Sequence, residues 1–545
     1  MSATFFIALF NLALPVFVIN VLNRYIGYGF DGTLITLTSG MVIAVFLQFG
    51  FRIARTKMLG AVSAEPDTRL AEKTLNTLVG ARIGALERIP PPRLQETING
   101  LQSVNVAYDA AAFTAILDAP FSLLYILATF FLSPILAFIA MGGILSALAA
   151  GAFSLVNTRE TARSLQDQMT SHRGQIDSAI DNSSTVRAFE GQPLLTRIWE
   201  RQIKKITALR LQLADRKERS QSVILTLGLL MNVVLYTVGA VFVVSGNMTV
   251  GALIGANILA SRAFQNVVRF VQTSYLIRKG HEAESKLQAF MTLPMEPNRG
   301  TALKQYKGGL RFKDLGFAYA GASGPLYESL NLNLTPGSVL IVTGKNGTGK
   351  TTLARLIIGL LIPSRGDILL DGISLRQVSP AWWRRQVIYF PQEPSFFNTT
   401  IRENLSLVYA VNNASPPLEK ELNRVIKAAD LRTFLDRAPQ GFDTPITNGG
   451  RHLALGIRRR LALARALMSN GMLAILDEPT EGLDADGCSA VYAIMNEMSK
   501  AEKTIIAFAH DPLIVKGANY RIDLNRKPVP KITRENQENP LISKR

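Results

Sequence analysis

Six long apolar runs crowd the first half of the chain and limit what it can fold into. They cover residues 3–21, 34–51, 113–132, 134–156, 223–245 and 250–271. Each is close to the roughly 20 residues that a helix needs to cross a bilayer. Every backbone polar group inside a bilayer must be bonded within its own segment, so these runs predict membrane-spanning helices. The last run is the least regular, because Arg262 and Arg269 interrupt it.

The charge of the connecting segments predicts the orientation of these spans. Lysine and arginine gather in residues 52–110 and 157–222, whereas residues 25–33 and 246–249 carry almost none. The positive-inside rule places both long segments, and with an even number of spans both chain ends, in the cytoplasm. The long segments have helical periodicity. We therefore expect the helices to continue out of the membrane and to turn near residues 100–108 and 172–188.

Composition excludes several classes of protein. The net charge of +18 is explained by basic loops beside anionic lipid, and no aromatic-interleaved basic stripe indicates nucleic acid. The single cysteine, Cys488, rules out an internal disulfide framework and a cysteine-based metal cluster.

Polar, proline-containing stretches divide the chain. We expect a membrane domain over residues 1–285, a linker over 286–305 that holds Pro294 and Pro297, and a second folded domain over 306–526, which the motifs described next predict to be nucleotide-binding. The basic segment 527–545 is expected to be a disordered tail. The fold class predicted is an α-helical six-span transmembrane domain fused to an α/β P-loop domain.

The clearest motif of the second half is a phosphate loop. An apolar run, the sequence GKNGTGKTT and an amphipathic segment predict a strand, a turn and a helix. Glycines let backbone N–H groups curl around phosphate oxygens at the positive end of the helix. Lys350 is expected to reach the β- and γ-phosphates, and the Thr351 hydroxyl to bind Mg²⁺. The expected nucleotide contacts are Gly344, Asn346, Gly347, Thr348, Gly349, Lys350, Thr351 and Thr352.

Three further motifs follow in an order that suits nucleotide hydrolysis. The run 473–476 ends in Asp477, expected to hold Mg²⁺, and Glu478, expected to activate the attacking water. Another apolar run ends near His510, placed to contact the γ-phosphate. Gln392, in a polar loop, is expected to bind Mg²⁺ and nucleotide. Taken singly, each of these residues is more often structural; the shared order gives them weight.

Together these motifs resemble the nucleotide-binding domain of ATP-binding cassette (ABC) transporters. The resemblance implies that Tyr319 stacks on adenine, that ATP and Mg²⁺ are the cofactors, and that Lys350, Glu478 and His510 form the catalytic group. Six spans ahead of the cassette resemble an exporter half-transporter. The stretch ILDAPFSLLYILATFF further resembles bacterial type I secretion transporters, which pass polypeptides to an adaptor protein and an outer-membrane channel. That family resides in the bacterial inner membrane, with its nucleotide-binding domain in the cytoplasm.

One motif departs from the family. Where ABC proteins carry Leu-Ser-Gly-Gly-Gln, this chain has Leu453, Ala454, Leu455, Gly456 and Ile457, and Asn448 replaces a usual glutamate upstream. In the family this signature contacts the γ-phosphate held by the partner subunit. Ala454 removes the hydroxyl, Leu455 adds bulk, and Ile457 removes an amide. The resemblance therefore implies a heterodimer with one consensus and one degenerate site; a homodimer with a tolerated variant is the alternative.

Three functions stay open on the sequence. The first is ATP-driven export of a polypeptide by a type I system. The second is a heterodimeric exporter of lipid, peptide or small molecule. The third is an ATP-binding regulatory subunit with little hydrolysis, against which the retained Glu478 and His510 argue.

Overall fold

The computed structural model describes residues 2–29, 31–409 and 417–534. Two compact units make up the chain. A membrane unit comprises Met1–Ala81 and Ala85–Pro294, and a nucleotide-binding unit comprises Arg82–Gly84 and Met295–Arg545. Each is described by itself.

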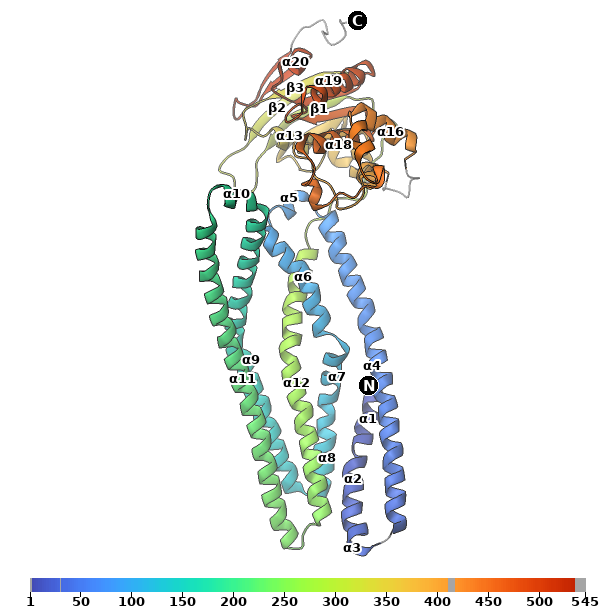
Figure 1. Ribbon diagram of the computed structural model, residues 1–545, viewed down its shortest axis with the longest axis vertical. Helices are drawn as coiled ribbons and strands as arrows, with labels where there is room; N and C mark the ends of the chain where they lie inside the picture. The colour runs from blue at the N-terminus through green and yellow to red at the C-terminus, as the bar shows by residue number, and fades with distance from the viewer. Residues whose placement is uncertain (1, 30, 410–416, 535–545) are drawn as a thin grey trace. The chain divides into compact units, whose positions relative to one another are not determined.

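The membrane unit consists of helices, several of them very long (Figure 1). The longest are α4 (Asp31–Gly80), α9 (Pro134–Asp181), α11 (Gln192–Val244) and α12 (Val250–Met291). A π-helical turn, Val21–Tyr25, joins α2 to α3. The remaining helices are α1 (Ser2–Asn11), α2 (Ala13–Asn20), α3 (Ile26–Tyr28), α6 (Pro91–Ala107), α7 (Ala110–Asp118), α8 (Ser122–Leu132) and α10 (Ser183–Ala188). The short helix α5 (Ile83–Leu86) has residues in both units.

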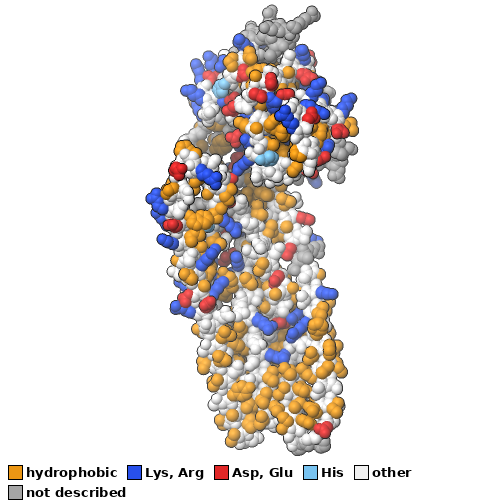
Figure 2. Space-filling model, viewed as in Figure 1, with side chains coloured by type: hydrophobic (Ala, Val, Ile, Leu, Met, Phe, Trp, Pro, Cys, Tyr) orange, Lys and Arg blue, Asp and Glu red, His pale blue; other side chains and the backbone are white. Residues whose placement is uncertain are grey.

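Five helical segments within the described residues are long and apolar enough to cross a membrane. They are Ser2–Tyr25, Asp31–Gly80, Ala110–Leu132, Pro134–Asp181 and Gln192–Val244. Helix α12, the expected sixth span, is less apolar because it carries Arg262 and Arg269, and its crossing stays a prediction. Three of the five extend far beyond a bilayer's thickness, as the periodicity of the long segments predicts. Apolar side chains cover the outer surface of one end of this unit (Figure 2).

One of the two predicted cytoplasmic turns is wrong. Residues 100–108 lie in and directly after helix α6, and the chain reverses earlier, between the end of α4 at Gly80 and the start of α6 at Pro91. Pro90, Pro91 and Pro92 explain this, since proline is accepted in the first turn of a helix and not in its interior. The second turn lies between Asp181 and Gln192, at the end of the predicted range.

Small residues let the membrane helices approach closely. The buried core of the unit includes Ala140 and Ala147 of α9 and Ala256, Ala260 and Ala263 of α12. Lipid tails are as apolar as leucine, so helix association in a membrane depends on close packing of such residues.

The nucleotide-binding unit holds two sheets. The first is antiparallel, with the order β2-β1-β4-β5. The second, in the order β10-β9-β3-β8-β7-β6, is parallel except at the β10 edge. The strands are β1 (Leu310–Phe317), β2 (Tyr327–Leu334), β3 (Val339–Thr343), β4 (Arg365–Leu370), β5 (Ile373–Ser374), β6 (Val387–Phe390), β7 (Leu473–Asp477), β8 (Thr504–Phe508), β9 (Tyr520–Asp523) and β10 (Lys531–Arg534).

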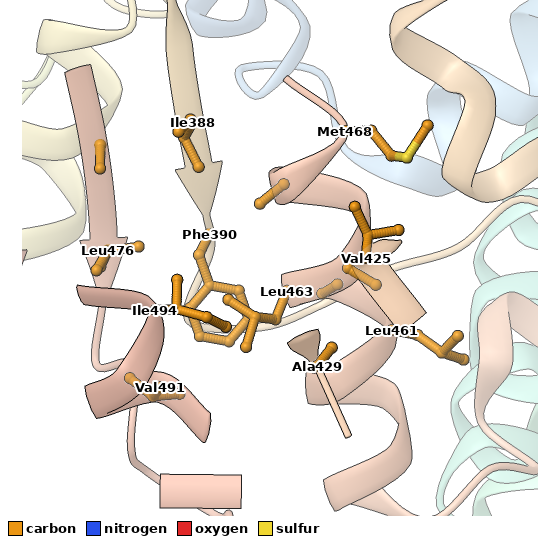
Figure 3. Packing of buried hydrophobic residues seen from close by; sticks show 14 of the residues in the cluster. Ile388, Phe390, Val425, Ala429, Leu461, Leu463, Met468, Leu476, Val491 and Ile494 are labelled. Atoms are coloured by element: carbon orange, nitrogen blue, oxygen red, sulfur yellow. The ribbon is translucent and has the colours of Figure 1, made fainter. Parts of the chain in front are cut away.

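Two apolar cores hold this unit together. One lies between the sheets and includes Phe312, Leu353 and Trp383. The other packs helices on the β6–β7 side of the parallel sheet, where Phe390 meets Leu463 and Ile494 (Figure 3). The helices are α13 (Lys350–Ile357), α14 (Pro380–Arg385), α15 (Ile401–Leu405), α16 (Glu419–Ala428), α17 (Arg432–Arg437), α18 (Leu455–Leu467), α19 (Ala485–Lys500) and α20 (Pro512–Lys516).

Two features differ from the predicted domain boundaries of 285, 305 and 526. Helix α12 continues to Met291, because Leu287 and Phe290 are buried and extend its apolar face past the expected start of the linker. Strand β10 pairs with β9 through Lys531–Asp523 to Arg534–Tyr520, so the predicted disordered tail 527–545 begins with an ordered strand. Residues 535–545 lie outside the described residues.

The contact between α6 and α12 gives a stability prediction. A Cβ atom at Gly280 would lie 2.1 Å from Ala107 Cβ, a rigid neighbour, whereas one at Gly100 would lie 3.5 Å from Ala283 Cβ. We expect Gly280→Ala to lower the apparent unfolding free energy by about 1–3 kcal/mol through overpacking. Gly100→Ala, on the same interface, should leave it unchanged or raise it by up to about 1 kcal/mol through helix propensity. Thermal unfolding in detergent measures both; equal effects would contradict the packing.

Candidate nucleotide-binding site

The parallel sheet brings the predicted nucleotide residues to one edge. Gly344 follows β3, Gln392 follows β6, Asp477 ends β7 and His510 follows β8. The carboxyl ends of parallel strands meet at the same edge, and ligands of open α/β sheets bind there. Residues that are as much as 166 positions apart in the chain therefore lie within hydrogen-bonding distance of one another.

The phosphate loop joins β3 to α13. Gly347 and Gly349 have φ angles of +79° and +102°, in the region that favours glycine. A Cβ atom on Gly349 would also lie 2.5 Å from Leu326 Cδ2. Asn346 and Gly347 are exposed at the tip of the loop, and Thr348 Oγ1 closes it by donating to the Lys345 carbonyl over 2.8 Å. The loop presents its backbone to a ligand at the start of α13.

Lys350, Glu478 and His510, the three predicted catalytic residues, converge beside this loop. The buried Lys350 Nζ lies 2.8 Å from Glu478 Oε1 and donates to the Gly344 carbonyl over 2.8 Å. His510 Nε2 lies 2.9 Å from Lys350 Nζ and 2.8 Å from the Gly344 carbonyl. The ring nitrogen can accept from the ammonium or donate to the carbonyl, and its tautomer decides which. A cation, a carboxylate and an imidazole thus meet where the γ-phosphate is expected.

The backbone at Glu478 is strained. Its φ is +49°, which is uncommon for a residue other than glycine, and its N–H donates to the Phe508 carbonyl over 2.8 Å. Such strain costs about 1–3 kcal/mol and gathers at functional sites. Here it turns the Glu478 side chain out of the sheet toward Lys350.

Three oxygens converge at the position predicted for Mg²⁺. Thr351 Oγ1 donates to Asp477 Oδ2 over 2.8 Å and lies 3.4 Å from Gln392 Oε1. Asp477 is fully buried, and its Oδ1 has no hydrogen-bond partner within the described residues. Desolvation raises the pKa of Asp477, with the neighbouring Glu478 charge adding to the rise. A hard cation prefers oxygen ligands and would both satisfy Oδ1 and stabilise its charge, so these residues fit Mg²⁺.

Tyr319 lies in the loop after β1. Its ring packs edge-on against Phe317, with ring centroids 4.9 Å apart, and its hydroxyl lies 2.8 Å from Thr352 Oγ1 in α13. The ring is 43 % exposed. An exposed aromatic face held by two contacts suits stacking on a base.

The altered signature forms the start of α18. Ala454 is the N-cap residue and, lacking an oxygen, makes no side-chain bond to the first turn. A serine there is a preferred cap, and its replacement by alanine costs about 1 kcal/mol of helix stability. Leu455 is 49 % exposed, and Gly456 follows it in the first turn, while Leu453 and Ile457 pack on the apolar core. Upstream, Asn448 adopts a φ of +49°, a conformation that asparagine tolerates better than glutamate does.

Sequence reasoning assigned no role to two residues that connect parts of the site. Arg459, 3 % exposed, donates to the Gln392 carbonyl over 3.0 Å and to the Glu478 carbonyl. Glu481 accepts from Gln392 Nε2 over 3.3 Å. Burial lowers the pKa of Arg459. A signal for Arg459 exists in the sequence, since it occupies the same face of α18 as the buried Ala462, Leu463 and Ala466.

Comparison with known proteins decides the family. A model described as ABC transporter matches residues 327–481, and one described as ABC transporter transmembrane region matches residues 1–268. The two together match most of the chain. The chain belongs to the ABC transporters.

Relatives of this ABC transporter match it from end to end. The leukotoxin export ATP-binding protein LtxB of Aggregatibacter actinomycetemcomitans is 26 % identical over 96 % of this chain and 73 % of its own length. The alpha-hemolysin translocation ATP-binding protein HlyB of Escherichia coli is 26 % identical over 99 % and 75 %. A solved bacterial Atm1-family ABC exporter with ATP bound shares the fold, with a TM-score of 0.84 and 20 % identity over 96 % of this chain and 93 % of that one.

These findings confirm several predictions. The chain is a multi-span ABC exporter of the inner membrane whose nucleotide-binding domain uses ATP to drive transport. The individual roles of the site residues, the Mg²⁺ ligands and the meaning of the altered signature stay predictions.

Substitution of Asp477 separates its chemical role from its structural one. At neutral pH the ionised carboxylate destabilises the fold, because its pKa is raised. Asp477→Asn should therefore keep or raise the thermal midpoint without nucleotide, while ATP hydrolysis by the chain purified with any accompanying subunit falls about 100-fold through loss of the metal ligand.

Asp443→Asn is the control. Asp443 is exposed, and a hydrogen bond from Arg402 lowers its pKa, so its ionised form stabilises the fold. The control should keep its hydrolysis rate and show no rise in midpoint. Wild-type hydrolysis by Asp477→Asn would contradict the metal role.

Proposed function

We propose that this chain is one half of a heterodimeric ATP-driven exporter that moves polypeptides out of the cytoplasm. The observation that carries the substrate class is the match to export and translocation proteins for toxins over nearly the whole chain. By analogy, an adaptor protein and an outer-membrane channel are the expected partners. The substrate is expected to carry its secretion signal at its exposed C-terminal end.

The nucleotide site supports hydrolysis by this chain. Lys350 is placed to bind the phosphates, Glu478 to accept a proton from the attacking water, and His510 to donate to the γ-phosphate. Thr351, Gln392 and Asp477 would hold Mg²⁺, which would stabilise the negative charge of the phosphates when bound. Arg459 fixes the backbone of Gln392 and Glu478, so that metal ligand and base hold their positions together.

The proposal of a heterodimer rests on the difference between this chain's complete phosphate-loop side and its altered signature. Its phosphate loop, Asp477, Glu478 and His510 are complete, while its signature lacks the serine hydroxyl that bonds a phosphate across the dimer. One hydrogen bond to a charged group is worth about 1.5–3 kcal/mol, which is roughly a tenfold to hundredfold change in affinity. A partner with an intact signature would complete this chain's loop, whereas self-pairing would leave both sites weakened. Self-pairing with a tolerated signature is the alternative.

An exporter of small molecules is the second candidate, and one cavity favours it. A cavity of about 170 Å³ lies between α9, α11 and α12. Lys217 Nζ sits 3.8 Å over the Tyr275 ring there, an arrangement suited to a polar ligand. Its volume is well below the roughly 300–1,000 Å³ of sites for drug-sized ligands, so the polypeptide exporter stays the first candidate. The regulatory subunit without turnover is disfavoured by the complete catalytic group.

Transport into sealed vesicles tests the substrate class. Inside-out vesicles that contain the chain with any accompanying subunit should take up an unfolded polypeptide bearing a C-terminal secretion signal when ATP is supplied. Glu478→Gln should reduce uptake at least about 100-fold, the size of effect expected for loss of general base catalysis. Protection of the polypeptide from added protease measures uptake. ATP hydrolysis without protected polypeptide, together with accumulation of a small solute, would contradict the proposal.

A further inference from the structure

A polar network crosses the membrane unit and centres on one amide. Asn11 Oδ1 accepts from Gln48 Nε2 of α4 over 2.8 Å and from Arg262 Nη1 of α12. Asn11 Nδ2 donates to the Tyr125 hydroxyl of α8 over 3.0 Å. Both lone pairs of the amide oxygen and one of its two N–H groups are therefore used by three other helices.

The charges around this network do not balance. Asp118 accepts from Arg55 Nη1 over 2.6 Å and is thereby paired. Arg52, one turn from Arg55 on α4, acts electrostatically on both Arg262 and Tyr125. Asp118 is the only acidic residue in the stretches 2–30, 32–64, 110–159 and 219–281, which hold all six predicted spans. Three guanidinium groups therefore share one carboxylate.

Two guanidinium groups have unused hydrogen-bonding capacity. Within the described residues Arg262 donates only to the Asn11 amide, although a guanidinium has five N–H donors. The Arg55 side chain is 11 % exposed, and its buried Nε has no partner in the same part of the chain. Unpaired charge and unused donors in an apolar region are costly unless an anion joins them.

The predicted depth of Arg262 in the membrane helps to decide whether that anion is a lipid phosphate or a carboxylate of the transported substrate. Arg262 lies 12 residues after the start of α12 at Val250, or about 18 Å along the helix axis. The hydrocarbon core is about 30 Å thick, so if α12 crosses as predicted, entering the membrane near Val250, Arg262 lies near the middle of the core and away from the level of lipid phosphates. Charged residues at this depth mark substrate or ion pathways. A carboxylate that travels through the transporter fits this depth better than a phospholipid headgroup does.

We propose that Arg262, with Arg52 and the Asn11–Gln48–Tyr125 network, binds aspartate and glutamate side chains of the exported polypeptide as they cross the membrane. This assignment rests on the proposed polypeptide substrate. A guanidinium binds a carboxylate through two parallel hydrogen bonds, and Asn11 holds Arg262 through Nη1, which leaves Nε and Nη2 available for such a pair. The site selects for acidic segments and disfavours basic ones.

Peptide binding tests the site directly. The chain, purified with any subunit that accompanies it, is placed in phosphatidylcholine nanodiscs. Fluorescence anisotropy then compares an unfolded peptide rich in aspartate with its counterpart carrying asparagine at each of those positions. The wild type should bind the acidic peptide about tenfold more tightly, as expected for a charge-assisted bidentate contact. Arg262→Gln should abolish this preference, and Arg262→Lys, which keeps the charge but cannot form the two parallel hydrogen bonds, should keep only part of it.

Arg269→Gln is the matched control, since it removes the same charge from an exposed residue two turns further along α12. It should keep the preference. If Arg262→Gln lowered the affinity for both peptides equally, the network would have a purely structural role, which would overturn the site. A wild type with equal affinity for the two peptides would overturn it as well. A wild type that binds neither peptide would contradict the polypeptide substrate itself. If the preference for the acidic peptide disappeared in phosphatidylglycerol nanodiscs, the anionic lipid would be the ligand of Arg262, and the proposed site would be overturned.

Discussion

The carboxyl-end edge of one parallel sheet determines where this transporter carries out its chemistry. Strands β3, β6, β7 and β8 end together, and the charged groups that we predict to act in ATP hydrolysis lie at or after those ends. The helices on the β6–β7 side bury the apolar face that keeps these strands in register. Arg459 then links two strand ends from α18. The start of that helix carries the altered signature, so the hydrolytic site and the contact made across the dimer share one helix.

The two parts of this chain that are predicted to contact ATP differ in how completely they retain the polar groups typical of the family. These parts are the phosphate-loop side and the signature at the start of α18. The Lys350–Glu478–His510 group and the Thr351–Asp477 pair are joined by bonds of 2.8–2.9 Å. The α18 N-terminus has an uncapped Ala454 and an exposed Leu455. In the proposed heterodimer this difference would give an asymmetric cycle, in which the site on this chain's phosphate loop hydrolyses ATP and the other site mainly holds nucleotide. The excess positive charge beside Arg262 adds a preference for acidic substrate in the membrane unit.

The sequence predicts those features that depend on local patterns. Long apolar runs and the phosphate loop establish the membrane and nucleotide-binding units, because each has a fixed length or spacing. Features that depend on contacts between residues far apart in the chain are not predicted from the sequence. Asn11 and Arg262 are 251 residues apart, and β10 is ordered only through its pairing with β9. The misplaced turn near residues 100–108 shows that helical periodicity does not mark where a hairpin reverses, whereas the prolines at 90–92 do.

The proposed heterodimer requires that the signature of this chain cannot activate ATP hydrolysis in a self-paired dimer. The most direct measurement is steady-state ATP hydrolysis by the purified chain alone in lipid, compared with its Ala454→Ser/Leu455→Gly double variant and with Glu478→Gln as background. We predict that the wild-type chain hydrolyses ATP at a rate near background. The double variant should be at least about tenfold faster, because it regains the hydrogen bond to phosphate. A wild-type rate equal to that of the double variant would contradict the claim and indicate a working homodimer.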